Sequence, residues 1–181
     1  VTETELEAVT RYFAEQLTAA ADSVPQDENG LYAVPKVQIL EESTAVYGGV
    51  TELYPFLRFR DTGVKAVRCS RLMSIMGFTG VYFSCIWESN VNVDSPACLL
   101  PSTIAHELAH QRGIAWEQEC NFLGVLASVT SGLPDYAYSG WLLGFIHLGN
   151  ALYDTDPAAY WAIRDTLPET VEADLRDNNA Y

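Results

Sequence analysis

The sequence contains few basic residues and few histidines. Ten Lys and Arg residues stand against 24 Asp and Glu residues among 181, so the formal net charge at pH 7 is −14, and only three residues are histidine. Because nucleic acids and anionic membranes are bound through basic patches, this balance argues against both as partners.

Long apolar runs are also absent from the sequence. The nearest candidate, 140–150, falls below the ~18–20 residues of a transmembrane helix, and its His147 and Asn150 favour a buried core helix.

Cysteine is scarce, and its spacing excludes one kind of metal site. The four cysteines, at positions 69, 85, 98 and 120, form no Cys-x-x-Cys pair, so a separate structural zinc site is not expected. An even number is compatible with one or two disulfides in an extracytoplasmic domain and also with buried thiols. Cys85 and Cys98 bracket the segment that precedes residue 100 and are the expected pair.

The composition predicts one ordered domain that spans residues 1–181. Apolar residues make up 49% of the chain and charged residues 19%, which is typical of a globular protein with a sizeable core. Helical periodicity occurs in an N-terminal helix within 1–24 and again at about 40–50, 115–130, 134–153, 157–165 and 168–177. The stretches 64–69 and 80–87 favour strands. The expected fold class is α+β, mainly helical with a small β-sheet.

A His-Glu-x-x-His motif at His106, Glu107 and His110 is the most informative feature of the chain. On a helix, the i, i+4 spacing places both imidazoles on one face, where they can bind one metal ion. Glu107 leaves the helix beside them and is the expected general base. Pro101 and Gly113 fit the start and the end of such a helix. The motif predicts a Zn²⁺ site with peptidase chemistry.

The residues alone leave three candidates for the third protein ligand, since Glu117, Glu119 and His147 all lie downstream of the motif. A turn after Gly113 and a second helix would carry Glu117 past the two histidines. Glu117 and Asn121 share one face of that helix, whereas Glu119 lies about 200° around it at ~100° per residue. Asn121 would then hydrogen-bond a ligand histidine and orient it.

Two family resemblances rest on these residues. Glu117-x-x-Cys120-Asn121 after the first motif resembles the second motif of gluzincins, peptidases whose third zinc ligand is glutamate. More narrowly, the chain resembles an uncharacterised family of membrane-anchored bacterial proteins, a domain of unknown function, in the stretches 69–80, 88–92, 106–121 and 138–140. The gluzincin link from His110 to Glu117 is unusually short here. It is similar to the metzincin turn, although Trp116 occupies the metzincin ligand position and cannot bind zinc.

These resemblances imply a zincin-like fold, with the first motif on a buried helix and Glu117 as third ligand on the following helix. They place the zinc-site core at about 60–153. They also imply that the chain is the ectodomain of a membrane-tethered protein on the extracytoplasmic face of a bacterial membrane.

Other polar residues could complete the site. Glu88, Asn90 and Asn92 alternate, which fits either a polar loop or an edge strand along the active-site cleft. Hydrolysis also needs a donor for the oxyanion. Tyr138 and His147 are the first candidates and Tyr136 a weaker one; alternatively, Tyr138 and His147 simply pack in the core.

The sequence therefore predicts a zinc-dependent peptidase that acts on a peptide or protein substrate. The alternative is a catalytically idle ectodomain of the same fold that binds a peptide or a cell-envelope partner. A purely structural zinc would need four protein ligands, and only three good ones are found.

Overall fold

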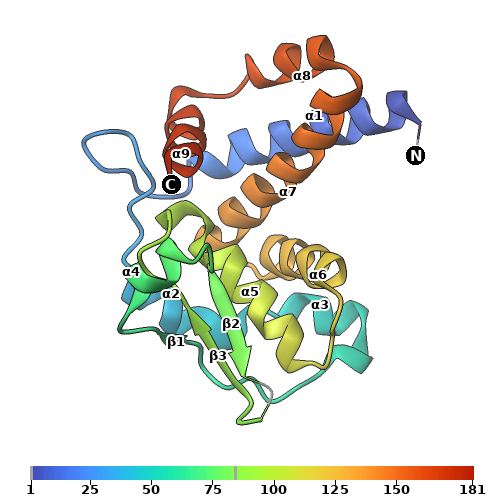
Figure 1. Ribbon diagram of the computed structural model, residues 1–181. Helices are drawn as coiled ribbons and strands as arrows, with labels where there is room; N and C mark the ends of the chain where they lie inside the picture. Colours follow the sequence, from blue (N-terminus) through green and yellow to red (C-terminus); the bar gives the residue numbers. More distant parts are fainter. Residues whose placement is uncertain (1, 84) are drawn as a thin grey trace.

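The computed structural model describes residues 2–83 and 85–181 and shows a mainly helical α+β fold with a three-stranded sheet (Figure 1). This confirms the predicted fold class. In chain order the elements are α1 (Glu3–Ala21), α2 (Lys36–Glu42), η1 (Ser43–Ala45), α3 (Gly48–Leu53), η2 (Pro55–Leu57), β1 (Lys65–Ala66), α4 (Ser70–Ile75), β2 (Gly80–Phe83), β3 (Glu88–Val91), η3 (Ala97–Leu99), α5 (Leu100–Gln111), α6 (Glu117–Thr130), α7 (Pro134–Thr155), α8 (Pro157–Arg164) and α9 (Glu169–Ala180).

The first helix forms where local signals agree with burial. A capping box joins Thr2 and Glu5, since each side chain accepts a hydrogen bond from the other residue's backbone N–H. Leu17 is fully buried, and α1 lies along α7 (Figure 1). Gly144 of α7 lacks the Cβ that would collide with the ring of Phe13, so the two helices approach closely at that point.

Helix α5 lies at the centre of the fold. Nine of its twelve residues are buried, which is more than one amphipathic face provides. It packs against α6, α7 and the sheet. At Gly124 of α6, an added Cβ would lie 3.1 Å from the backbone nitrogen of His106, so glycine allows α6 to approach α5 closely. On another side of α5, the Tyr47 hydroxyl donates a hydrogen bond to the carbonyl of Ala105 at 2.8 Å.

The sheet has the strand order β1-β3-β2, with β3 parallel to β1 and antiparallel to β2. Ser89 of β3 is completely buried, and its hydroxyl donates to the carbonyl of Glu107 at 3.1 Å. The side-chain amide of Gln111 donates to the same hydroxyl at 2.9 Å. These bonds attach the central strand to α5, and β2 therefore forms an edge of the sheet beside the helix.

Several elements differ from the predicted ones. The helix expected at 40–50 is divided into α2, η1 and α3. Of the strand expected at 80–87, Gly80–Phe83 form β2, Ser84 lies outside the described residues, and 85–87 are in a turn in which the N–H of Ile86 donates to the carbonyl of Phe83 at 3.1 Å. All four cysteines are free thiols, with Cys98 buried and Cys85 exposed, so the expected Cys85–Cys98 disulfide is wrong. Among the described residues, no helix is long and apolar enough to cross a membrane.

Candidate metal centre

Two helices bring together three side chains of types that can bind a metal ion. His106 and His110 lie one turn apart on α5, and α6 begins at Glu117 after a turn in which Gly113 has a φ of 84°. The Nε2 atom of His106 lies 3.2 Å from Glu117 Oε2, and the Nε2 atom of His110 lies 3.5 Å from Glu117 Oε1. The structure thus places Glu117 at the two imidazoles, as the sequence analysis expects for the third ligand.

Hydrogen bonds behind the imidazoles fix which nitrogen faces Glu117. His106 Nδ1 lies 2.8 Å from Asn121 Oδ1, and His110 Nδ1 lies 2.9 Å from the carbonyl oxygen of Ile114. Both partners are acceptors, so each Nδ1 carries the proton and each Nε2 presents a lone pair. Burial, together with the neighbouring His110, lowers the pKa of His106, which favours the neutral form that binds a metal. The predicted contact between Asn121 and a histidine is present.

The spacing of these atoms fits a tetrahedral zinc ion. Ligand atoms ~2.0–2.1 Å from zinc and about 109° apart are separated from each other by about 3.3 Å. The measured separations of 3.2 and 3.5 Å lie close to that value. Two imidazoles and one carboxylate are also a typical donor set of a catalytic zinc site with an open fourth position. The residues therefore fit the metal that the sequence predicts.

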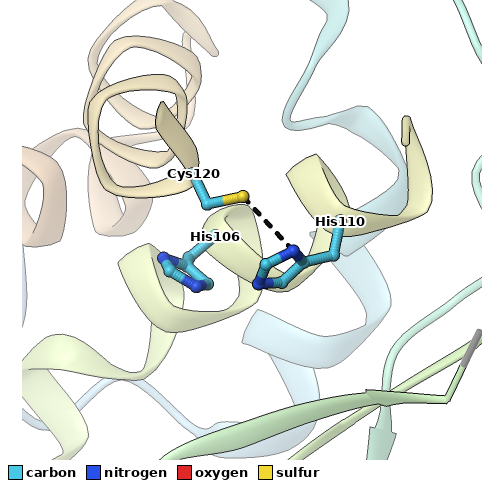
Figure 2. Close-up of side chains that lie close together, drawn as sticks. All are labelled: His106, His110 and Cys120. Atoms are coloured by element: carbon cyan, nitrogen blue, oxygen red, sulfur yellow. Dashed lines mark hydrogen bonds between the residues drawn. The ribbon is translucent and has the colours of Figure 1, made fainter. Parts of the chain in front are cut away.

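Cys120 lies near both histidines, with its sulfur at the Nδ1 atom of His110 (Figure 2). Its fully buried sulfur is 3.3 Å from His110 Nδ1 and 3.6 Å from the carbonyl of Ile114. Although sulfur and ring nitrogens are close enough to share an ion, Nδ1 already donates to Ile114, and Nε2 on the opposite edge of the ring faces Glu117. Cys120 thus supports the ring from behind. The sequence places it next to Asn121 but gives no sign of this contact.

Glu107 is the third member of the motif, and its carboxylate is almost completely enclosed. The residue is only 5% exposed, and its Oε2 atom is buried without a hydrogen-bond partner. Burial raises the pKa of Glu107 to about 8, and the negative charge of Glu117 adds to the shift. Gly80 of β2 faces this carboxylate. A Cβ at Gly80 would lie 2.7 Å from Glu107 Cδ, so only glycine leaves enough space.

A pocket of about 670 Å³ opens above these residues. One wall carries His106, Glu107, His110, Glu117 and Asn121, and the opposite wall is the segment 77–82, which includes most of β2. The ring of Tyr82 lies parallel to that of His110, with 6.3 Å between the centroids. Sequence reasoning missed Gly80 and Tyr82, because a strand pattern does not reveal which helix the strand will cover.

The structure does not bring the predicted oxyanion donors to the pocket. Tyr138 is 2% exposed, and its hydroxyl donates to Asp174 Oδ2 at 2.6 Å, while its ring stacks on Tyr32. Tyr136 donates to the carbonyl of Ile39. His147 lies exposed on α7 and is not among the residues that line the pocket. The direction of these side chains is set by the packing of α7 against its neighbours, so Tyr138 and His147 are corrected to residues outside the site.

The remaining candidates also lie outside the pocket. Glu119 lines a separate hollow with Phe56 and Phe122, so the alternative third ligand is not at the histidines. Asn90 and the ion-paired Glu88 belong to β3, which is the central strand and not the expected edge. Asn92 is buried, and its amide donates to the carbonyl of Phe78 at 3.0 Å, which holds the turn that leads into β2.

Comparison with known proteins identifies a family but no function. Over residues 1–181 the chain matches the family described as "Protein of unknown function (DUF3810)", and it belongs to that family. No curated protein and no solved structure matches it.

Proposed function

We propose that this member of the DUF3810 family is a zinc-dependent peptidase in which Glu107 is the general base. One observation supports the proposal most strongly. Two Nε2 atoms and the Glu117 carboxylate converge beside a buried glutamate that has an unpartnered oxygen, and all four residues line one pocket. A structural zinc site would have four protein ligands and no adjacent base.

His106, His110 and Glu117 would hold the ion, and Asn121 and the Ile114 carbonyl would keep both imidazoles in the binding tautomer. Zinc in such a site acts as a Lewis acid toward a peptide carbonyl and makes a nearby water more acidic. Glu107 accepts the proton of that water at its free oxygen and can pass it to the leaving amine. Gly80 keeps the space for this carboxylate.

The edge strand β2 provides a place for an extended peptide. Among the described residues β2 pairs only with β3, so its other edge retains unpaired backbone groups along the pocket wall. A peptide can add to such an edge as a further strand, and its hydrogen bonds then use the backbone and not particular side chains. The scissile bond would lie between β2 and the two histidines. With Tyr138 outside the site, Tyr82 is the residue of this wall best suited to contact the carbonyl oxygen.

The test combines zinc content with cleavage of a broad peptide library. The wild-type protein should contain about one zinc per chain and cleave peptides, and His106→Ala should lose both properties. Glu107→Gln should keep the zinc but lose ~10²–10⁴-fold in turnover, since an amide cannot accept the proton. Glu119→Ala is the matched control and should behave as wild type, because its side chain lies in another hollow.

Two results would refute the proposal. Cleavage by Glu107→Gln at the wild-type rate would mean that another base or a contaminant is responsible. Absence of cleavage by a zinc-loaded wild-type protein across the library would favour the idle ectodomain that binds a peptide or a cell-envelope partner.

A further inference from the structure

The charge of residues 54–87, hereafter the outer layer, is opposite to that of the rest of the chain. Five of the ten basic residues lie here, namely Arg58, Arg60, Lys65, Arg68 and Arg71, and all five are exposed. The only acidic residue of the outer layer is Asp61, which is paired with Arg112. The layer therefore has a formal charge of +4, so the other residues carry −18 of the total of −14. Whole-chain charge conceals this division.

The outer layer also exposes an unusual amount of apolar surface. Among the described residues, ten of the eighteen large apolar side chains that are exposed belong to it, although it is less than a fifth of the chain. Phe56 is 80% exposed and Ile75 is 77% exposed. Single exposed apolar residues are ordinary, but their concentration in one region marks a surface that binds something.

These side chains lie on turns, on the short helices η2 and α4 and at the end of β2. Phe56 belongs to η2, and Ile86 and Trp87 belong to the turn that leads into β3. Phe59 stacks on Trp87 with 6.2 Å between the ring centroids, which joins the two segments. In Figure 1, the connection from α3 to β1 and the far end of β2 lie at the end of the molecule opposite α1 and α8. The segments that carry Phe59 and Trp87 therefore meet at this end, and the exposed Arg58 and Arg60 flank Phe59 in the chain.

Trp87 adds a separate observation. It is the only described non-glycine residue with a positive φ, at 55°, and it is 57% exposed. A bulky side chain in this backbone region is strained, and glycine or asparagine would adopt it at lower cost. Strain of this kind persists at functional sites more often than elsewhere. A tryptophan that is both strained and mostly exposed contributes little to folding, so its contribution is expected in binding.

We propose that the outer layer docks on the surface of a lipid bilayer that contains anionic headgroups. Aromatic and aliphatic side chains on projecting turns can enter the interfacial region, while the arginines among them contact the headgroup phosphates. The rest of the chain, at −18, is repelled by the same surface, so only this face can approach it. The pocket lies beside the layer, because Gly77 to Tyr82 form one of its walls. Docking would therefore bring the candidate metal centre close to the membrane.

A vesicle sedimentation assay with the 181-residue chain tests the proposal independently of any enzymatic activity. Vesicles of phosphatidylcholine with phosphatidylglycerol should bind the protein, vesicles of phosphatidylcholine alone should bind it much less, and added salt should weaken the binding. Replacing both Arg58 and Arg60 by glutamate should reduce binding at least ~30-fold, since each basic residue near such a surface contributes about fivefold. Phe56→Ser and Ile86→Ser should each reduce it about tenfold.

Matched controls carry the same changes elsewhere on the surface. Arg176→Glu on α9 and Trp161→Ser on α8 alter similarly exposed residues and should leave vesicle binding unchanged. Trp87→Asn should reduce binding while the thermal midpoint stays equal or rises, a combination that a merely structural tryptophan would not give. The proposal is overturned if neither vesicle binds the protein at low salt, or if the control variants lose binding equally. It is also overturned if the layer instead forms a dimer whose dissociation the same substitutions cause without any vesicle binding.

Discussion

The helical body, which consists of α1 and α5 to α9, and the outer layer are built by different means. Helix α5 buries nine of its twelve residues, and α7 buries ten of twenty-two. In the outer layer only Leu57, Val64, Ser70 and Met73 are buried among the described residues of 54–87. The body is thus held by a continuous apolar core, whereas the layer is held by a small number of specific contacts. Segments with little buried apolar surface open at lower free energy than the core.

The candidate metal centre lies between these two regions and uses both. The body supplies His106, His110 and Glu117 on helices that the core holds in place. The layer supplies the opposite wall, with Gly80 and Tyr82. Metal binding should therefore depend on the body, while the environment of Glu107 should depend on how the layer is attached. A substitution in the body should therefore change metal binding, whereas a substitution in the layer should change the environment of Glu107.

The strongest expected effect comes from the contact that joins the layer to α5. The Arg112 side chain is 2% exposed, pairs with the 10% exposed Asp61 at 2.7 Å and donates to the carbonyl of Leu57 at 3.0 Å. Arg112→Met would leave the Asp61 carboxylate buried without a partner, which costs about 3–5 kcal/mol. We expect a large decrease in the unfolding free energy from urea titration, and faster amide exchange in residues 57–66 than in α1 and α7.

Arg176→Met is the matched control for this experiment. Its pair with Glu169 is exposed on both sides, so the same substitution should change stability by about 0–1 kcal/mol. Equal effects of the two substitutions would mean that the Arg112 contact does not hold the layer.

A smaller effect is expected from Gly80→Ala, which changes the layer without altering a ligand. The new Cβ would lie 2.7 Å from Glu107 Cδ, and the enclosed carboxylate has little room to move. Overpacking of this kind costs about 1–3 kcal/mol. Zinc content should stay near one per chain, because none of the three ligands is touched, while cleavage should fall. Gly48→Ala, which meets no atom within 4 Å, should alter neither property. Loss of zinc in Gly80→Ala would contradict this separation of the two regions.

The sequence predicts the body well because its signals are local. Helical period and caps identify α1 and α6 to α9 to within a few residues. The same reasoning finds His106, His110, Glu117 and Asn121, since each pair is separated by one helical turn and needs only the helix to be correct. The structure adds that the turn of α5 with the two histidines faces the first turn of α6. The short link through Gly113 makes this possible.

What the sequence could not predict depends on packing between distant segments. Gly80 and Tyr82 face the motif only because β2 lies beside α5, and neither residue carries a signal of that arrangement. Tyr138 and His147 follow α6 closely along the chain, but the rotation of α7 about its axis is set by its packing against α1 and α6. That rotation turns Tyr138 toward Asp174 and leaves His147 exposed. The whole-chain net charge likewise conceals the basic segment 54–87, because it averages over two regions of opposite sign.

The smallest expected effect concerns the pH dependence of stability in the body, at the junction of α7 and α9. Burial raises the pKa of Asp174, although its carboxylate accepts hydrogen bonds from the Tyr138 hydroxyl and the backbone N–H of Tyr32. A carboxyl whose pKa is raised by folding contributes most to stability below the usual aspartate pKa of about 4. That contribution is lost as the pH rises through the folded-state pKa, because the unfolded chain releases its proton first. Asp174→Asn cannot titrate; its amide oxygen can still accept from the backbone N–H of Tyr32, while its NH2 group can donate to the Tyr138 hydroxyl oxygen. In urea unfolding, its stability relative to the wild type should rise between pH 4.5 and pH 7, and the exposed Asp154→Asn should show no such rise. A wild-type protein that gained stability relative to Asp174→Asn over this range would mean that the hydrogen bonds outweigh burial and that the pKa of Asp174 is lowered.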